Sequence, residues 1–178
     1  MKGIFWKEGE SFTNSMSLIV SLLVRYPGIA TISFDPASKS LQFTFVVARP
    51  LTPPEFDRFV GTVKESLAVL LNLSGRMPRL CDLNLSAYDG MSFLEVRRDI
   101  DSLLPDEIAL LVSLIDDEFE GELVRDQDET IGEEDQAIQE EVIEHMLEDL
   151  KDSRQEKKLI GFREEGRVMV FNRASLHK

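Results

Sequence analysis

Residues that build disulfides and metal sites are nearly absent from this sequence. Cys81 is the single cysteine among 178 residues, which excludes an intrachain disulfide and a zinc site made of several thiolates. His145 and His177 are the two histidines, so a histidine-rich metal site is excluded as well. We therefore expect no cofactor, and at most weak binding of a divalent cation.

Signals for membranes, for export and for common nucleotide sites are also missing. The longest apolar runs lie within 18–24 and 67–71, whereas a membrane helix needs roughly 20 apolar residues. The segment around Gly9 and Asn14 is too polar for the core of a signal peptide. Neither a GxGxxG loop nor a GxSxG nucleophile elbow occurs. Together with the lone cysteine, these absences predict a cytoplasmic protein without membrane association.

Basic residues are almost lacking from one stretch of the chain. Residues 101–150 contain 19 acidic residues and one basic residue, Arg125, whereas residues 1–100 contain 11 basic and 10 acidic ones. The whole chain has a net charge of −13 and a pI of about 4.6. Such a molecule repels the phosphate backbone of nucleic acids, so we expect no DNA partner.

The rest of the composition is that of a folded domain, with 43% hydrophobic and 30% charged residues. Helical spacing, strand alternation and turn signals indicate four helices and three hairpins. The expected helices cover 15–25, 52–72, 105–121 and 133–154, and the expected hairpins cover 29–48, 80–98 and 158–173. Because hairpin strands pair antiparallel, the sequence predicts an α+β fold in which about four helices pack on a mostly antiparallel sheet.

Two local motifs predict element boundaries. The sequence TPPE at 52–55 combines a capping box with prolines in the first helical turn, where their missing N–H groups cost nothing. The Asp89-Gly90 pair is a two-residue turn signal, which predicts a tight hairpin between the flanking strands.

A polar, acidic segment divides the chain. We expect residues 1–124 to form an α+β core, 125–132 to form an acidic mobile loop that proteases cut after Arg125, and 133–178 to add an acidic helix and a hairpin. Two strands alone are marginally stable in water, so this hairpin should complete the same core and leave a single domain overall. The loop mimics the start of a calcium loop, but Ala137 stands where the bidentate glutamate is required.

The acidic stretch indicates a surface for protein partners. Charge of one sign on helices steers the association of oppositely charged proteins. We therefore predict a small interaction or regulatory module, a monomer or a homodimer, that presents an acidic helical face to a protein partner, for which a basic protein is a candidate. The residues expected to form this face are Asp116, Asp117, Glu118, Glu140, Glu144 and Glu148.

An alternative hypothesis is a metal-dependent or carboxylate-using enzyme of unknown substrate. Glu141, His145 and Asp149 follow one another at intervals of four, so they share one side of a helix and could ligate a divalent metal. The helix-bundle di-iron pattern needs a glutamate three residues before the histidine, but position 142 is Val142. The sequence offers few residues in arrangements typical of catalysis, so an interaction function is the favoured prediction.

Overall fold

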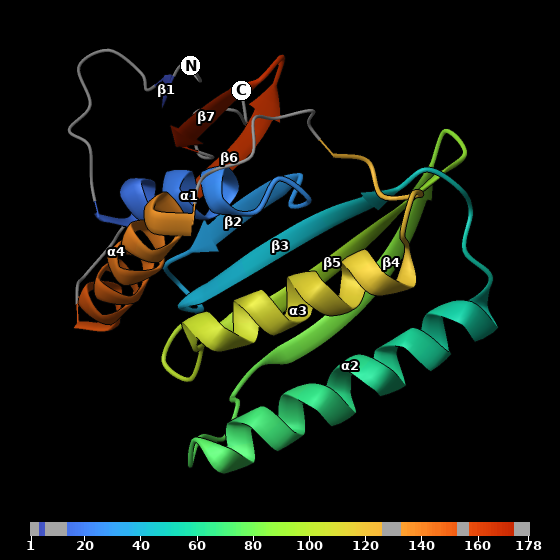
Figure 1. Ribbon diagram of the computed structural model, residues 1–178, viewed down its shortest axis with the longest axis horizontal. Helices are drawn as coiled ribbons and strands as arrows, with labels where there is room; N and C mark the ends of the chain where they lie inside the picture. The colour runs from blue at the N-terminus through green and yellow to red at the C-terminus, as the bar shows by residue number, and fades with distance from the viewer. Residues whose placement is uncertain (1–3, 6–13, 126–132, 153–156, 173–178) are drawn as a thin grey trace.

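The computed structural model describes residues 4–5, 14–125, 133–152 and 157–172. These residues form seven strands and four helices (Figure 1). The strands are β1 (Ile4–Phe5), β2 (Thr31–Asp35), β3 (Ser40–Val47), β4 (Cys81–Tyr88), β5 (Met91–Asp99), β6 (Leu159–Glu164) and β7 (Arg167–Asn172). The helices are α1 (Asn14–Arg25), α2 (Pro53–Leu73), α3 (Pro105–Glu118) and α4 (Glu133–Asp152). The predicted α+β class, with three hairpins and four helices, is confirmed.

All seven strands belong to one sheet, in the order β1-β7-β6-β2-β3-β5-β4. Three hairpins, β2–β3, β4–β5 and β6–β7, supply six of the strands. The last hairpin joins the first because β6 pairs antiparallel with β2, which places Gly161 opposite Ile32. The sequence had indicated no strand at Ile4–Phe5, where the short β1 pairs parallel with β7.

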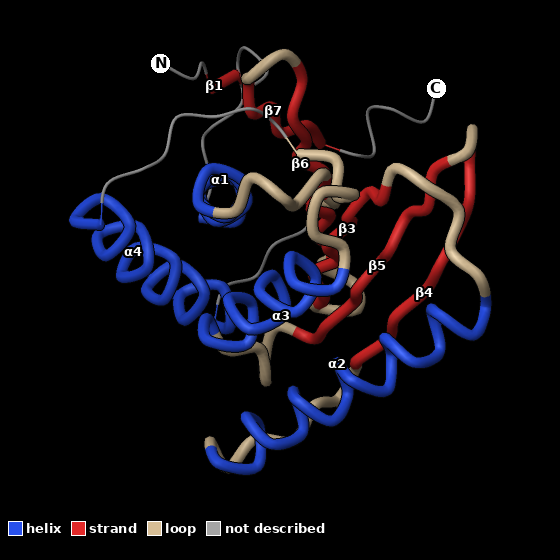
Figure 2. Tube along the Cα trace, turned by 45° about the vertical axis from the view of Figure 1, so that its right-hand side comes forward, coloured by secondary structure: helices blue, strands red, loops and turns tan. Residues whose placement is uncertain are grey.

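The helices cover one face of this sheet, as the views in Figures 1 and 2 show. Strand alternation decides which face they cover, since successive side chains point to opposite sides. Phe43 lies between Ile32 and Val96 on the inner face, and all three are buried. On the other face, no helix among the described residues covers the strands.

Helix α1 approaches the sheet closely at Gly161 of β6. A Cβ atom at this position would lie 2.2 Å from Cγ2 of Ile19 and 3.0 Å from Cδ1 of Leu23. The absent side chain therefore lets the apolar face of α1 lie on β6, and α4 packs in turn on α1. In α4, Ile143, Leu147 and Leu150 are buried, whereas Ile138 is 60% exposed.

Helix α2 begins as the capping box predicts. The Thr52 hydroxyl accepts a hydrogen bond from the backbone N–H of Glu55, and the Glu55 carboxylate accepts one from the backbone N–H of Thr52. Arg49 donates hydrogen bonds to both Glu55 and Glu122. The bond from Arg49, together with the bond from the Thr52 backbone, lowers the pKa of Glu55 to about 2.

Residues 126–132, which contain nearly all of the predicted mobile loop, lie outside the described residues, so its mobility stays a prediction. His177 also lies outside the described residues. Among the described helices, none combines the length and the apolarity that crossing a membrane requires.

Candidate functional site

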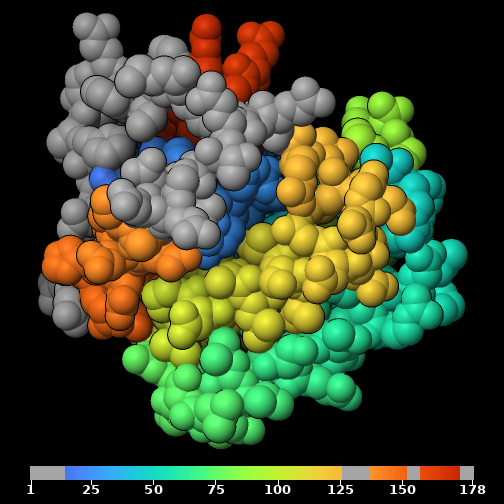
Figure 3. All heavy atoms as spheres, viewed as in Figure 1, coloured from blue at the N-terminus to red at the C-terminus, as the bar shows by residue number. Residues whose placement is uncertain are grey.

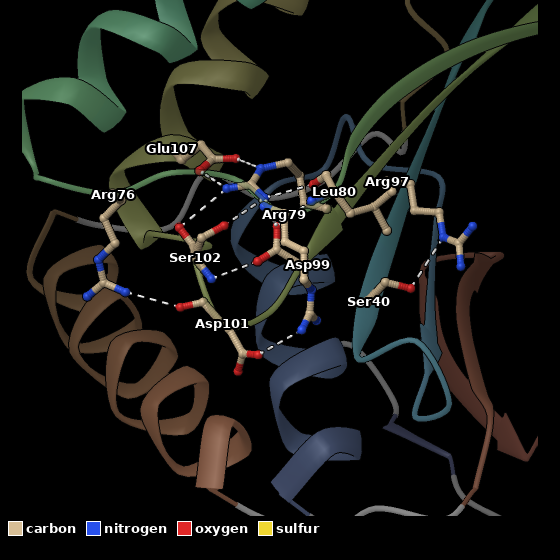
Figure 4. Close-up of polar contacts among 10 residues, drawn as sticks. Ser40, Arg76, Arg79, Leu80, Arg97, Asp99, Asp101, Ser102 and Glu107 are labelled. Carbon is tan, nitrogen blue, oxygen red and sulfur yellow. Dashed lines mark hydrogen bonds and ion pairs between the residues drawn. The ribbon is translucent and has the colours of Figure 1, made fainter.

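A buried cluster of charges lies at the end of β5. Arg98 is on the inner face of the sheet with 1% of its surface exposed. Its Nε donates to Glu107 at 2.5 Å and its Nη2 donates to the same carboxylate at 2.7 Å. Its Nη1 donates to Asp99 at 2.5 Å and to the carbonyl of Leu80 at 2.9 Å. Figure 4 shows Glu107, Asp99 and Ser102 gathered at this point.

The electrostatics of this cluster favour the charged forms of Arg98 and Asp99. Burial acts to lower the pKa of Arg98, but the hydrogen bonds and the charge of Glu107 outweigh burial and the pKa is raised. Burial acts to raise the pKa of Asp99, but hydrogen bonds from Ser102 and the charge of Arg98 hold it below its usual value. Because Glu107 stands in the first turn of α3, the cluster fixes where that helix begins.

Next to this fixed start of α3, a cleft opens between α3 and α4. Its volume is about 350 Å³. In Figure 3, α4 (orange) meets the first part of α3 (yellow-green) on the face toward the viewer. Four carboxylates and five less polar residues line the cleft, and we call it the acidic cleft: Asp106, Glu140, Glu141, Glu144, Tyr26, Pro105, Ala109, Ala137 and Ile143.

The negative charge of the acidic cleft acts on Tyr26. Burial raises the pKa of the Tyr26 phenol, the charges of Glu140 and Asp106 raise it further, and Arg25 opposes them. Arg25 donates a hydrogen bond to Glu140 at 3.0 Å, and its guanidinium carbon lies 4.7 Å from the centre of the Tyr26 ring. At one wall of the cleft, the Arg25 guanidinium thus already contacts both the Glu140 carboxylate and the Tyr26 ring.

The six acids of the predicted helical face fall into separate places. Glu140 and Glu144 line the acidic cleft. Asp116 and Asp117 line a different cavity, of about 560 Å³, near the end of α3.

Several of these acids are paired. Asp116 forms an ion pair with Arg125. Oε1 of Glu118 lies 4.0 Å from Nη2 of Arg58. Oε1 of Glu148 lies 2.8 Å from Nζ of Lys151. Lys151 lowers the pKa of Glu148. Glu144, in contrast, forms no ion pair with another described residue.

The residues of the alternative metal site are only partly brought together. His145 Nε2 lies 3.5 Å from Asp149, and the His145 side chain is 81% exposed. Glu141 lines the acidic cleft instead. Within the part of the chain that the structure describes, no three His, Cys, Asp or Glu side chains gather so that they could hold a metal ion. The metal hypothesis therefore gains no support from this geometry and stays a prediction.

Sequence reasoning did not place Asp106 or Tyr26 at a functional site. Their meeting with α4 is a tertiary contact between segments far apart in the chain. The only local signal was the Pro105-Asp106 pair, which marks a first helical turn and so an acidic helix N-terminus.

Comparison with known proteins adds no family to these observations. No family model matches the sequence, and searches of curated proteins and of solved structures found no significant similarity. The interpretation of the acidic cleft therefore depends on its geometry and charge.

Proposed function

We propose that the protein is an interaction module that docks a basic segment of a partner protein in the acidic cleft. The observation that carries this proposal is the convergence of Asp106 from α3 with Glu140, Glu141 and Glu144 from α4 around one cavity. Neither Glu141 nor Glu144 forms an ion pair with another described residue. We propose that these two carboxylates receive a cationic side chain of the partner.

The shape of the acidic cleft suits a lysine or arginine side chain. Pro105, Ala109 and Ala137 supply an apolar lining for the methylene stem, while the carboxylates can accept hydrogen bonds from the charged head. Arg25 gives an internal precedent, because it contacts both Glu140 and the ring of Tyr26. Arginine binds carboxylates and aromatic faces in this manner at protein interfaces.

The other predicted acids support docking from a distance. Asp117, Glu118 and Glu148 lie on the same two helices and add to the negative potential that steers a basic partner. The same potential repels nucleic acid phosphates, so we propose a protein partner rather than DNA. We place this interaction in the cytoplasm, where a chain with one free cysteine, Cys81, needs no oxidising environment.

The proposal is tested with a fluorescein-labelled peptide of alternating arginine and alanine. We expect the double variant Glu141→Gln/Glu144→Gln to weaken its binding at least about tenfold, or roughly 1.4 kcal/mol, in fluorescence anisotropy. The matched control is Glu65→Gln/Glu164→Gln, which removes the same charge from exposed residues elsewhere. An equal loss in both double variants would show that the peptide responds to net charge alone, and the proposal would be wrong.

A further inference from the structure

The sheet has one long edge that no described strand covers. Strand β4 is the last in the order, and it pairs with β5 over its whole length, from Cys81 opposite Arg98 to Tyr88 opposite Met91. The register contains no bulge. Among the eight residues of β4 there is one charged side chain, Asp82, and no proline. Proteins usually block an exposed edge with charges, proline or bulges, so this edge has little protection against pairing.

The hydrophobic core is left open at the same edge. On β5, the inner residues Leu94 and Val96 are 2% and 1% exposed. Their neighbours on β4, Leu85 and Leu83, are only partly buried. Beside them, a cavity of about 280 Å³ lies between α2 and the start of β4, and Met77 at its rim is 87% exposed. The apolar side chains on the inner face are thus buried in the centre of the sheet but only partly buried at β4.

We infer that β4 pairs antiparallel with β4 of a second copy about a twofold axis perpendicular to the sheet. Such an axis keeps the helices of both copies on one side and continues the sheet through both. Antiparallel pairing places side chains of opposed residues on the same face. The helix-covered faces of the two copies therefore coincide only when the axis passes between one residue of β4 and the same residue of the second copy.

Apolar matching and charge favour one residue at the axis. With Asn84 opposite Asn84 of the partner copy, Leu83 faces Leu85 and Asp82 faces Ser86. No like charges meet in this register, since Asp82 is the one charged residue of β4. An axis at Asp82 would instead place the two Asp82 carboxylates opposite each other.

The distribution of charge over the molecule favours this edge for self-association. The first hundred residues, which include α2, β4 and β5, are almost balanced, with 11 basic and 10 acidic residues. The strongly acidic residues 101–150 belong mainly to α3 and α4. Figure 1 shows α4 across the sheet from β4, so pairing at β4 holds the two α4 helices far apart.

Cysteine cross-linking tests the register. Cys81→Ser/Asn84→Cys has one thiol per chain, at the proposed axis, where opposed Cα atoms are about 4.5–5.5 Å apart and can form a disulfide. In Cys81→Ser/Ser86→Cys the two thiols stand four residues apart along the paired strands, about 13 Å, which is too far. We expect rapid oxidation to a covalent dimer only for the cysteine at 84, by non-reducing electrophoresis.

Two variants that carry opposite charges at one exposed position test the same contact without cysteine. Ser86→Asp would face Asp82 of the partner copy twice, and Ser86→Lys would form two attractive pairs there. We expect the dimer dissociation constant of the aspartate variant to exceed that of the lysine variant about tenfold in sedimentation equilibrium. Ser33→Asp and Ser33→Lys, on β2, are the matched controls and should differ little from each other.

Three results would overturn the inference. Wild-type protein could remain a monomer at about 100 µM in light scattering, a concentration far above a typical working affinity. The thiols at 84 and 86 could cross-link equally well. Finally, the Ser86 variants could respond no differently from the Ser33 variants. A monomer would leave the β4 edge open to a strand of another protein.

Discussion

The ion pairs of this protein lie in two contrasting environments. Around Arg98, a guanidinium and the carboxylates of Asp99 and Glu107 are almost completely buried, at 1–3% side-chain exposure. Between Arg58 and Glu118, the charges are 4.0 Å apart with 73% and 40% exposure. Buried charges that lose a partner stay in a medium of low polarity, whereas exposed charges exchange a partner for water at small cost. The buried cluster therefore serves the fold, whereas exposed acids can change partners at small cost.

The largest effect is expected from removing the buried cation. Arg98→Met leaves Asp99 and Glu107 unpaired inside the protein and should lower the free energy of unfolding by roughly 3–5 kcal/mol. Urea denaturation measures this change. The matched control is Arg58→Met, which removes an exposed cation and should cost less than about 1 kcal/mol.

A double variant sharpens this comparison. In Arg98→Met/Glu107→Leu, one of the two buried carboxylates disappears with its partner, so part of the lost stability should return. If Arg98→Met alone costs no more than its exposed control, the cluster does not stabilise the fold as we describe.

An intermediate effect is expected on acidification. The folded-state pKa of Glu55 is lowered to about 2 and that of Asp99 is lowered too, so both stabilise the fold above the ordinary carboxyl pKa. This contribution should be lost as the pH falls from about 4.5 towards 2. Free energies of unfolding measured across this range should fall less steeply for Glu55→Gln than for the wild type. Parallel profiles would contradict the role assigned to Arg49 beside Glu55.

The smallest effect is expected on α4. Lys151 lies 2.8 Å from Glu148, but the Glu148 side chain is 59% exposed, so Glu148→Gln should change stability by only about 0.3–0.5 kcal/mol. Thermal unfolding followed by circular dichroism measures the shift, and Glu144→Gln, without such a pair, is the reference. A loss above about 1 kcal/mol would place this pair with the buried cluster.

Local signals in the sequence were enough for the elements but not for their arrangement. The capping box at Thr52 and the Asp89-Gly90 turn act within a few residues, and Asp89 does adopt the left-handed φ of 52° that a tight turn requires. The order of strands depends instead on contacts between distant segments, such as Ile32 with Gly161. No local pattern encodes that pairing.

For the candidate site, the sequence predicted only that an acidic surface exists, and not which acids meet there. The excess of acids between 101 and 150 indicated an acidic surface, and Glu140 and Glu144 do line the acidic cleft. Which acids meet depends on how α3 is positioned, and Arg98 decides that through Glu107. Arg98 alternates with apolar residues at the end of a strand, where a solvent-exposed arginine is the ordinary expectation.

The insertion of β6 beside β2 has a consequence for how the chain is made. During synthesis, β2 and β3 leave the ribosome long before Gly161 does, and at usual rates the interval is on the order of ten seconds. Throughout that time the free side of β2 exposes unpaired backbone groups, and Leu23 of α1 lacks the strand on which it packs. The nascent chain therefore completes the pairing of β2 and the packing of α1 only after the β6–β7 hairpin has emerged.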